Sequence, residues 1–451
     1  MKLKTMTINE MADFTYNCTC GRIHNVDIKH IRIGQDVIGM ITDLLKDFLG
    51  RRIWLVADRN TYDAAGGLTE AILGKDFNLY WHIFKEEHLV PDERAVGKLL
   101  IGMPEGTAFV LGIGSGTISD LCRYISYRTH IPYGIICTAP SMDGYASNVS
   151  PLLINGIKVT SQAVYPYAII AETEIISKAP TTMLQAGLGD ILGKYTALAD
   201  WRLAELLNME YFCHEIEELV LRAIDKCAGV AINCIKRDGQ AVESMAEALI
   251  LSGLTIGMAG SSRPASGEEH HLSHCWEAAF LNKEKTDQWL HGTKVGVGVG
   301  IIMEAYRYLK GLDIQKIEAS GEYMVFDESR WAENLREVYG KGSKDIIEAK
   351  RALMNFDCEK RKEKMKQITD NWDRILELSE KYFPDPYTVT KILKETGAIT
   401  SPLEMGIDRE FFKQSFIAAK DIRMRYGVLQ LLEDIGKLDA AAEAIANIYY
   451  C

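Results

Sequence analysis

Four of the chain's ten histidines lie between His270 and His291. His270 and His274 are four residues apart, so on a helix they share one face. His291 follows from the next expected element. Neutral imidazole is the commonest metal ligand, and three protein ligands with one open position are typical of a catalytic divalent metal. The spacing alone leaves a second interpretation open, in which these histidines cap a helix or hydrogen-bond locally.

A glycine-rich segment, Gly112-Ile113-Gly114-Ser115-Gly116-Thr117, lies between an apolar strand pattern and an amphipathic helix pattern. Backbone N–H groups at such a helix start bind phosphate oxygens, and glycine permits their close approach. The segment departs from Gly-x-Gly-x-x-Gly, so it meets the dinucleotide fingerprint only in part. A plain strand-to-helix turn is the alternative.

Two further segments end expected strands. Asp58 follows the apolar run Ile53–Ala57, where an acid can accept hydrogen bonds from an adenosine ribose or can cap a helix. The segment Thr138–Ser147 follows another strand pattern and carries hydroxyls and the Asp143 carboxylate. Open α/β sheets bind ligands at the carboxyl ends of their strands, so we expect both segments to face a ligand.

The elements that must position these residues change character along the chain. Strands are expected at 52–58, 78–84, 108–114 and 132–140, with helices at 92–103 and 117–127 between them, a pattern that implies a parallel sheet. After Pro180 the periodicity predicts helices, at 184–207, 216–235, 241–257, 270–280, 294–309, 345–378 and 408–445. We therefore expect an α/β plus all-α protein: a Rossmann-like dinucleotide-binding domain at 1–178, then an all-helical metal- and substrate-binding domain at 179–451.

Composition excludes several classes of protein. The chain has 451 residues, 47% of them hydrophobic and 25% charged, and a net charge of −11. The negative charge argues against binding to nucleic acid or to an anionic membrane surface. No run of 18 apolar residues and no apolar leader are found, so we expect no membrane span, no signal peptide and a cytoplasmic location.

Cysteine usage indicates reduced thiols. Cys122, Cys137, Cys213, Cys227 and Cys234 lie in apolar runs, as buried thiols do. The segment 18–24, Cys-Thr-Cys-Gly-Arg-Ile-His, could form a small metal site, but one Cys-x-Cys with one histidine gives too few ligands. We expect a turn near a strand edge there.

The order of the motifs resembles a family. After the glycine-rich loop and the Ser141-x-Asp143 segment come Gly187-Leu-Gly-Asp190-x-x-Gly-Lys194, the His270-x-x-x-His274 helix and His291-Gly-x-Lys-Val295. This order resembles the metal-dependent polyol dehydrogenase superfamily, which includes glycerol dehydrogenase, iron-dependent alcohol dehydrogenase and dehydroquinate synthase. The segments Thr138–Ser147 and Ser262–His270 are most similar to bacterial sn-glycerol-1-phosphate dehydrogenases. The resemblance implies a dehydroquinate synthase-like fold and a homo-oligomer, a dimer.

The resemblance also implies roles for individual residues. Asp190, His270 and His291 match its ligands for one divalent metal, Zn²⁺ or Ni²⁺. His274 and Asp143 match catalytic residues that, with Asp190, contact substrate. The matches to contacts of NAD(H) or NADP(H) are Asp58, Gly114, Ser115, Gly116, Thr117, Ile118, Thr138, Ala139, Pro140, Ser141 and Ser147.

Three departures from the superfamily pattern bear on these roles. The loop is Gly-Ile-Gly-Ser-Gly where many members have three consecutive glycines. Arg123 stands where the superfamily has lysine, which leaves the pyrophosphate contacts open. The acid ligand is Asp190 and not the glutamate of dehydroquinate synthases, which disfavours that activity.

The implied reaction is the reversible reduction of dihydroxyacetone phosphate to sn-glycerol 1-phosphate in a cleft between the domains. Lys158 and Arg263 are the expected cations for the phosphate of this triose, although each could equally be a surface charge. Three alternatives stay open: a glycerol dehydrogenase, a non-redox lyase similar to dehydroquinate synthase, and an inactive protein that binds nucleotide and metal.

Overall fold

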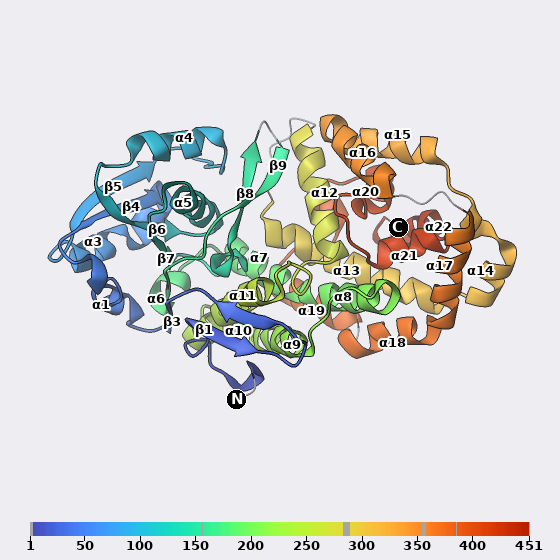
Figure 1. Cartoon of the computed structure of the whole chain (residues 1–451), viewed down its shortest axis with the longest axis horizontal. Coiled ribbons are helices and arrows are strands. Elements are labelled where there is room, and N and C mark those ends of the chain that lie inside the picture. Colours follow the sequence, from blue (N-terminus) through green and yellow to red (C-terminus); the bar gives the residue numbers. More distant parts are fainter. Residues whose placement is uncertain (1–2, 155–156, 283–288, 354–357, 385, 451) are drawn as a thin grey trace. The chain divides into compact units, whose positions relative to one another are not determined.

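The computed structural model describes residues 3–154, 157–282, 289–353, 358–384 and 386–450 (Figure 1). The chain forms two compact units. Unit 1 comprises Met1–Ile191 and His214–Ser262, and unit 2 comprises Leu192–Cys213 and Arg263–Cys451. The last sheet strand ends at Glu172, close to the expected change from strands to helices. The units divide the chain at other places, because helices from 214–262 pack with the strand-containing part.

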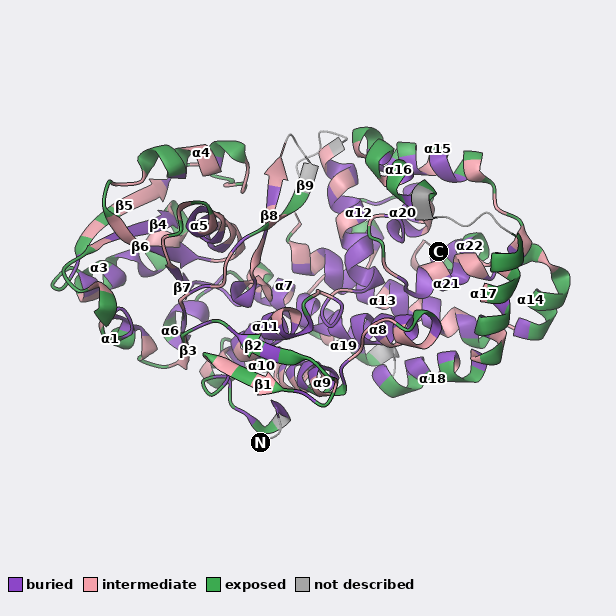
Figure 2. Cartoon of the chain, viewed as in Figure 1, coloured by how far each residue is buried: buried purple, intermediate pink, exposed green. Residues whose placement is uncertain are grey.

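Unit 1 is built on a six-stranded parallel sheet with the order β3-β10-β7-β6-β4-β5. Residues 53–57 of β4 are all buried, as is all of β7 (Figure 2). Such continuous apolar runs are typical of parallel strands that are covered on both faces. The predicted parallel sheet is therefore confirmed. Its strands are β3 (His30–Gly34), β4 (Arg52–Asp58), β5 (Asn78–Phe84), β6 (Thr107–Gly114), β7 (Tyr133–Cys137) and β10 (Ala168–Glu172).

The strand order reverses at β4, which has β5 on one side and β6 on the other. Val56 pairs with Gly112, so the carboxyl ends of β4 and β6, at Asp58 and Gly114, are neighbours. Ligands of open α/β sheets bind outside the carboxyl ends of the strands at such a switch point. The fold of unit 1 thus places two of the predicted cofactor segments where a ligand is expected.

Two antiparallel hairpins accompany the sheet, and neither was expected from the sequence. They are β1 (Phe14–Asn17) with β2 (Ile23–Val26), and β8 (Val149–Ile154) with β9 (Ile157–Gln162). The turn expected in the segment 18–24 is confirmed at residues 18–22, which connect the first hairpin, while Ile23 and His24 already belong to β2. The α-helices of unit 1 are α1 (Ile41–Leu44), α2 (Arg59–Thr61), α3 (Gly67–Leu73), α4 (Glu93–Gly102), α5 (Gly116–Thr129), α6 (Thr173–Ile176), α7 (Thr181–Leu192, whose last residue belongs to unit 2), α9 (His214–Ala228), α10 (Ala231–Ile235) and α11 (Gly239–Ala259).

In the part of the chain that the structure describes, unit 2 consists of helices joined by turns and loops and has no strand. Helices α12 and α13 pack against each other, α12 also contacts α15 and α20, and α13 contacts α18, α19 and α22. Both helices are largely buried, so the histidines at their starts are held by packed elements (Figure 2). The α-helices are α8 (Lys194–Asn208), α12 (Glu268–Asn282), α13 (His291–Lys310), α14 (Ile314–Ser320), α15 (Glu328–Tyr339), α16 (Ser343–Leu353), α17 (Cys358–Asp370), α18 (Trp372–Tyr382), α19 (Pro386–Glu395), α20 (Arg409–Ala419), α21 (Val428–Asp434) and α22 (Leu438–Tyr449).

One helix of the described chain, α11, is long and apolar enough to cross a membrane by length and composition. No such segment was expected from the sequence. In the structure, 72% of the most apolar 18-residue stretch of α11 is buried. A core helix passes the same test, and α11 packs against α9, α10 and β2.

Candidate active site

Glycines in the loop after β6 are required by packing. A Cβ on Gly114 would lie 2.6 Å from Cβ of Ile118, and one on Gly112 would lie 2.9 Å from Cδ1 of Ile135. Both positions bring the strand close to its neighbours, whereas a Cβ on Gly116 would meet Met142 Cε at an ordinary 3.7 Å. The Ser115 side chain makes no capping hydrogen bond to α5, so it does not occupy the backbone N–H groups of the first turn. Such N–H groups, at the positive end of the helix dipole, favour an anion.

Asp58 caps a helix. Its carboxylate accepts a hydrogen bond from the backbone N–H of Thr61 at 2.8 Å, and the Asp58 backbone N–H donates to the Thr61 hydroxyl oxygen at 3.0 Å. This is the local alternative that the sequence left open. The capping bond engages Oδ1, and the residue is half-buried, so capping and ribose binding are compatible.

Arg123 replaces the superfamily's lysine, and its guanidinium is fully buried. It donates to Tyr133 Oη at 2.9 Å, to Asp120 Oδ1 at 2.8 Å and to the backbone oxygen of Val149 at 2.9 Å. It also donates to the Ser119 hydroxyl and to the backbone oxygens of Gly144 and Tyr145. Arg123 therefore fixes the loop after β7.

That loop, Thr138–Ser147, rests directly on two helix backbones. A Cβ on Gly187 of α7 would lie 2.0 Å from the Pro140 backbone oxygen. A Cβ on Gly253 of α11 would lie 2.3 Å from the Asp143 backbone oxygen. Only glycine permits these approaches, so the Gly187-Leu-Gly-Asp190 motif has a packing reason as well as a chemical one.

Two predicted site acids of unit 1 are brought together here. The backbone N–H of Asp143 donates to Oδ2 of Asp190 at 2.9 Å, and the Ser252 hydroxyl donates to Oδ2 of Asp143 at 3.0 Å. Asp190 is fully buried on α7. Ser252, on α11, was not expected from the sequence. These bonds fix both carboxylates, so their oxygens are presented in defined directions.

In unit 2, His270 is oriented by a buried carboxylate. Its Nδ1 lies 2.7 Å from Oε1 of Glu269, which also accepts from the Gly267 backbone N–H at 2.7 Å. Oε2 of Glu269 accepts from the Thr196 hydroxyl at 2.6 Å. Burial raises the pKa of Glu269, but the His270, Thr196 and Gly267 interactions outweigh it and the pKa is lowered. A carboxylate on Nδ1 makes Nε2 the atom of His270 that could bind a metal.

Glu277 holds the other two histidines. Its Oε1 lies 3.1 Å from Nδ1 of His291 and 3.3 Å from Nζ of Lys294, and its Oε2 lies 3.1 Å from Nδ1 of His274. The His274 and His291 rings are stacked with centroids 5.4 Å apart, and those of His270 and His291 are 5.2 Å apart. The structure thus brings the three predicted histidines of unit 2 together. Donor atoms of His274, Glu277 and His291 lie within 4.8 Å of one another, a second group that could hold an ion.

The two expected phosphate cations differ in their surroundings. Lys158 lies on β9, opposite Leu153, but its side chain is outside the described residues. Arg263 is buried, and it donates from Nε to Glu210 at 2.7 Å and from Nη1 to the Tyr426 backbone oxygen at 2.8 Å. Its guanidinium is thus engaged within unit 2.

The structure adds a cationic cluster that the sequence did not reveal. Burial, followed by the positive charges of Arg263 and Arg423, lowers the pKa of Arg425 to about 10, and the negative charges of Glu210 and Glu269 offset part of this shift. Arg425 lies within reach of the segment before α12, where its Nη1 donates to the Ser266 backbone oxygen at 3.4 Å. Because like charges raise each other's free energy, an anion at this cluster would be stabilised.

Some of these residues carried a signal in the sequence. Glu269 directly precedes His270, and Glu277 follows His274 by three residues, which is one turn of a helix. Ser252 and Arg425 carried none, because they come from elements distant in sequence.

Comparison with known proteins agrees with this fold. The family model for iron-containing alcohol dehydrogenase matches residues 32–180. A solved glycerol dehydrogenase from Schizosaccharomyces pombe aligns with a TM-score of 0.62 over 93% of this chain and 89% of that one, at 14% identity. A solved 1,3-propanediol oxidoreductase aligns with a TM-score of 0.58 over 93% and 100% of the two chains, at 14% identity. The fold is that of the iron-containing alcohol dehydrogenase class.

Sequence relatives narrow this class. Proteins named glycerol-1-phosphate dehydrogenase [NAD(P)+] from Halalkalibacterium halodurans and Methanosarcina barkeri are 37% and 40% identical, over 68% and 64% of this chain and 78% of each relative. One from Geobacillus stearothermophilus is 29% identical over 95% of this chain and 98% of its own. The chain belongs to the glycerol-1-phosphate dehydrogenase family.

Proposed function

We propose that this protein is an NAD(P)-linked oxidoreductase that reversibly reduces dihydroxyacetone phosphate to sn-glycerol 1-phosphate with the help of one divalent metal. The observation that carries the proposal is the histidine cluster of unit 2, where a carboxylate faces Nδ1 of each predicted histidine ligand. The choice of substrate rests on family membership, because the relatives are named for glycerol 1-phosphate.

We propose Asp190, His270 and His291 as the metal ligands. The motif match supports this set, and so do the surroundings of each residue in its own unit: a buried, hydrogen-bonded carboxylate on α7 and two imidazoles whose Nδ1 atoms face Glu269 and Glu277. One carboxylate and two neutral imidazoles suit Zn²⁺ or Ni²⁺.

We place NAD(H) or NADP(H) at the switch point of the sheet. The α5 N-terminus would face the pyrophosphate, and Asp58 the adenosine ribose. Residues 114–118, Thr138–Ser141 and Ser147 would line the rest of the cofactor site. A 2′-phosphate would meet the Asp58 carboxylate, so we expect a preference for NAD(H).

When bound, the nicotinamide supplies the hydride to the substrate carbon and the metal withdraws electron density from the substrate oxygen. The chain's own residues handle the proton. Nδ1 of His274 faces Glu277, so its Nε2 is the atom that can deliver a proton to the substrate oxygen, and the half-buried position of the ring allows exchange with water. Asp143, held by Ser252, would accept a substrate hydroxyl hydrogen bond.

For the phosphate, we propose the cluster of Arg423 and Arg425, with Arg263 adjoining it and Lys158 as a further candidate. The proposal rests on the positive charge gathered near Ser266, at the start of α12. Arginine suits phosphate because its planar donors bind two oxygens at once. We also propose a cytoplasmic homo-oligomer, a dimer.

The test is an assay of NADH and NADPH oxidation with dihydroxyacetone phosphate, using protein that has been stripped of metal and then restored with Zn²⁺ or Ni²⁺. We expect activity only after metal is restored, and a much higher kcat/KM with the phosphate ester than with dihydroxyacetone. A preference for the unphosphorylated substrate would establish a glycerol dehydrogenase instead. Cofactor binding without net oxidation would favour a lyase.

A further inference from the structure

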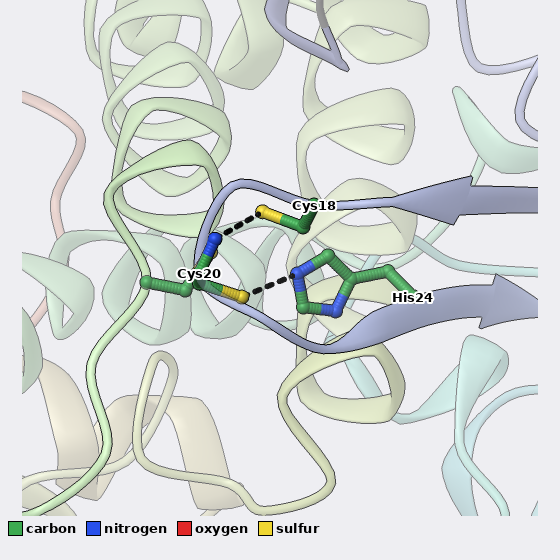
Figure 3. Close-up of side chains that lie close together, drawn as sticks. Cys18, Cys20 and His24 are labelled. Atoms are coloured by element: carbon green, nitrogen blue, oxygen red, sulfur yellow. Dashed lines mark hydrogen bonds between the residues drawn. The ribbon is translucent and has the colours of Figure 1, made fainter.

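The turn between β1 and β2 gathers sulfur and nitrogen donors (Figure 3). Asn17 pairs with Ile23, and the backbone N–H groups of Cys18 and Gly21 donate to the oxygens of Arg22 and Cys18 at 3.0 and 3.1 Å. Gly21 has φ +84°, a conformation that favours glycine. The ligand atoms of Cys18, Cys20 and His24 all lie within 4.8 Å of one another as a result.

Each donor is oriented by the backbone around it. Sγ of Cys20 lies 3.5 Å from Nε2 of His24, and the Cys20 backbone N–H donates to Sγ of Cys18 at 3.5 Å (Figure 3). Nδ1 of the fully buried His24 lies 2.8 Å from the backbone oxygen of Met258. The proton therefore sits on Nδ1, and the lone pair of Nε2 faces the thiols.

We propose that Cys18, Cys20 and His24 bind a structural Zn²⁺ ion that is separate from the proposed catalytic metal. Thiolate and imidazole donors within this distance match zinc, for which both are preferred ligands. Binding releases the two thiol protons to solvent, and both sulfurs then act as thiolates. The site shares no residue with the proposed catalytic set, and the argument for it does not depend on the proposed enzymatic activity.

Helix α9 holds the hairpin that carries these three donors. Glu215, in the first turn of α9, accepts a hydrogen bond from the Tyr16 hydroxyl at 2.7 Å.

The ion would fasten the hairpin to the end of α11. Besides the His24 contact to Met258, Nη1 of Arg22 donates to the Ala259 backbone oxygen at 3.3 Å. Two carbonyls at the helix C-terminus are thereby satisfied by the hairpin. Because α11 also carries Ser252 and Gly253, which contact Asp143, loss of the ion would loosen a helix that supports a site residue.

The test uses full-length protein reconstituted with Co²⁺, which reports its ligands by absorption. A thiolate on Co²⁺ gives an intense ligand-to-metal charge-transfer band in the near ultraviolet, whereas the carboxylate and imidazoles proposed for the catalytic metal do not. We expect two Co²⁺ per chain and this band in the wild type. Cys20→Ser should lose the band and one metal, while Cys358→Ser, at an exposed cysteine on α17, should keep both.

The variants also separate this proposal from the proposed function. His291→Ala should lose one metal and all activity but keep the thiolate band. Wild-type protein that binds Co²⁺ without a thiolate band overturns the site, whether or not the enzyme is active, and this result does not depend on any variant folding. X-ray absorption on the zinc form should show sulfur at about 2.3 Å.

Discussion

The contacts of Glu277 give a sharp prediction for Glu277→Gln. The carboxylate faces three donors, Nδ1 of His274, Nδ1 of His291 and Nζ of Lys294, at 3.1, 3.1 and 3.3 Å. Glutamine keeps one acceptor oxygen and puts an NH₂ group toward one of these donors. Losing such a partner typically weakens metal binding about 10–100-fold, which corresponds to about 1.4–2.7 kcal/mol. We expect a loss in that range, with cofactor affinity unchanged.

The measurement is a competition titration of Zn²⁺ between the protein and a chelator of known affinity, with Glu333→Gln, on the exposed side of α15, as the matched control. Two results would refute the reasoning. Unchanged metal affinity would show that Glu277 does not orient His291. Complete loss of metal, equal to that in His291→Ala, would show that Glu277 is itself a ligand, as the grouping of His274, Glu277 and His291 permits.

Four further predictions follow from single side chains. Arg425→Gln should raise KM for dihydroxyacetone phosphate about tenfold or more, since a charge-assisted hydrogen bond contributes about 1.5–3 kcal/mol. The same substitution should leave KM for dihydroxyacetone unchanged, and equal effects on both substrates would show that Arg425 does not bind the phosphate. Asp58→Ala should raise the ratio of kcat/KM for NADPH over NADH, and a flat ratio would leave Asp58 a helix cap only. Gly253→Ala should destabilise the protein by about 1–3 kcal/mol in urea unfolding, because its Cβ meets a backbone oxygen at 2.3 Å, whereas Gly97→Ala, with no atom within 4 Å, should not. Burial raises the pKa of Asp434 above its ordinary 3.8, so the stability that depends on the protonated carboxyl is fully present below pH 3.8 and is lost as the pH rises through the raised folded pKa. Asp434→Asn should therefore gain melting temperature relative to wild type as the pH rises above 3.8, and a difference that does not change with pH would contradict this.

The strands that the sequence predicted well are those with a run of apolar residues ended by turn residues. Strand β4, which is buried from Ile53 to Ala57, and the edge strand β5, in which only Phe84 is buried, both lie at their expected bounds. The short strands of the two hairpins escaped notice because four to six residues with one exposed face give little periodic signal. Long helical predictions failed at their interruptions: the helix expected at 184–207 is divided at Gly193 into α7 and α8.

Residues with recognisable chemistry were easier to find than the residues that hold them. The histidines could be identified from their type and spacing, and the described residues of unit 2 confirm that their rings lie close together. Whether Arg263 is available for a ligand could not be read from the sequence, because its partners Glu210 and Tyr426 are far from it along the chain. Pairing between buried charges that are distant along the chain is determined by the fold, so the local sequence pattern around each residue does not predict it.

Arg123 has a consequence for anyone who recombines this chain with its relatives. Its guanidinium makes hydrogen bonds to a tyrosine on β7, to its own helix and to three backbone oxygens between Gly144 and Val149. A lysine has three donors on one atom and cannot reach such a spread of acceptors. The arginine and the loop therefore form one exchangeable block: a chimera that imports a loop shaped around lysine, or lysine without its loop, should express as a folded sheet with a displaced Asp143, and grafts should carry residues 115–150 together.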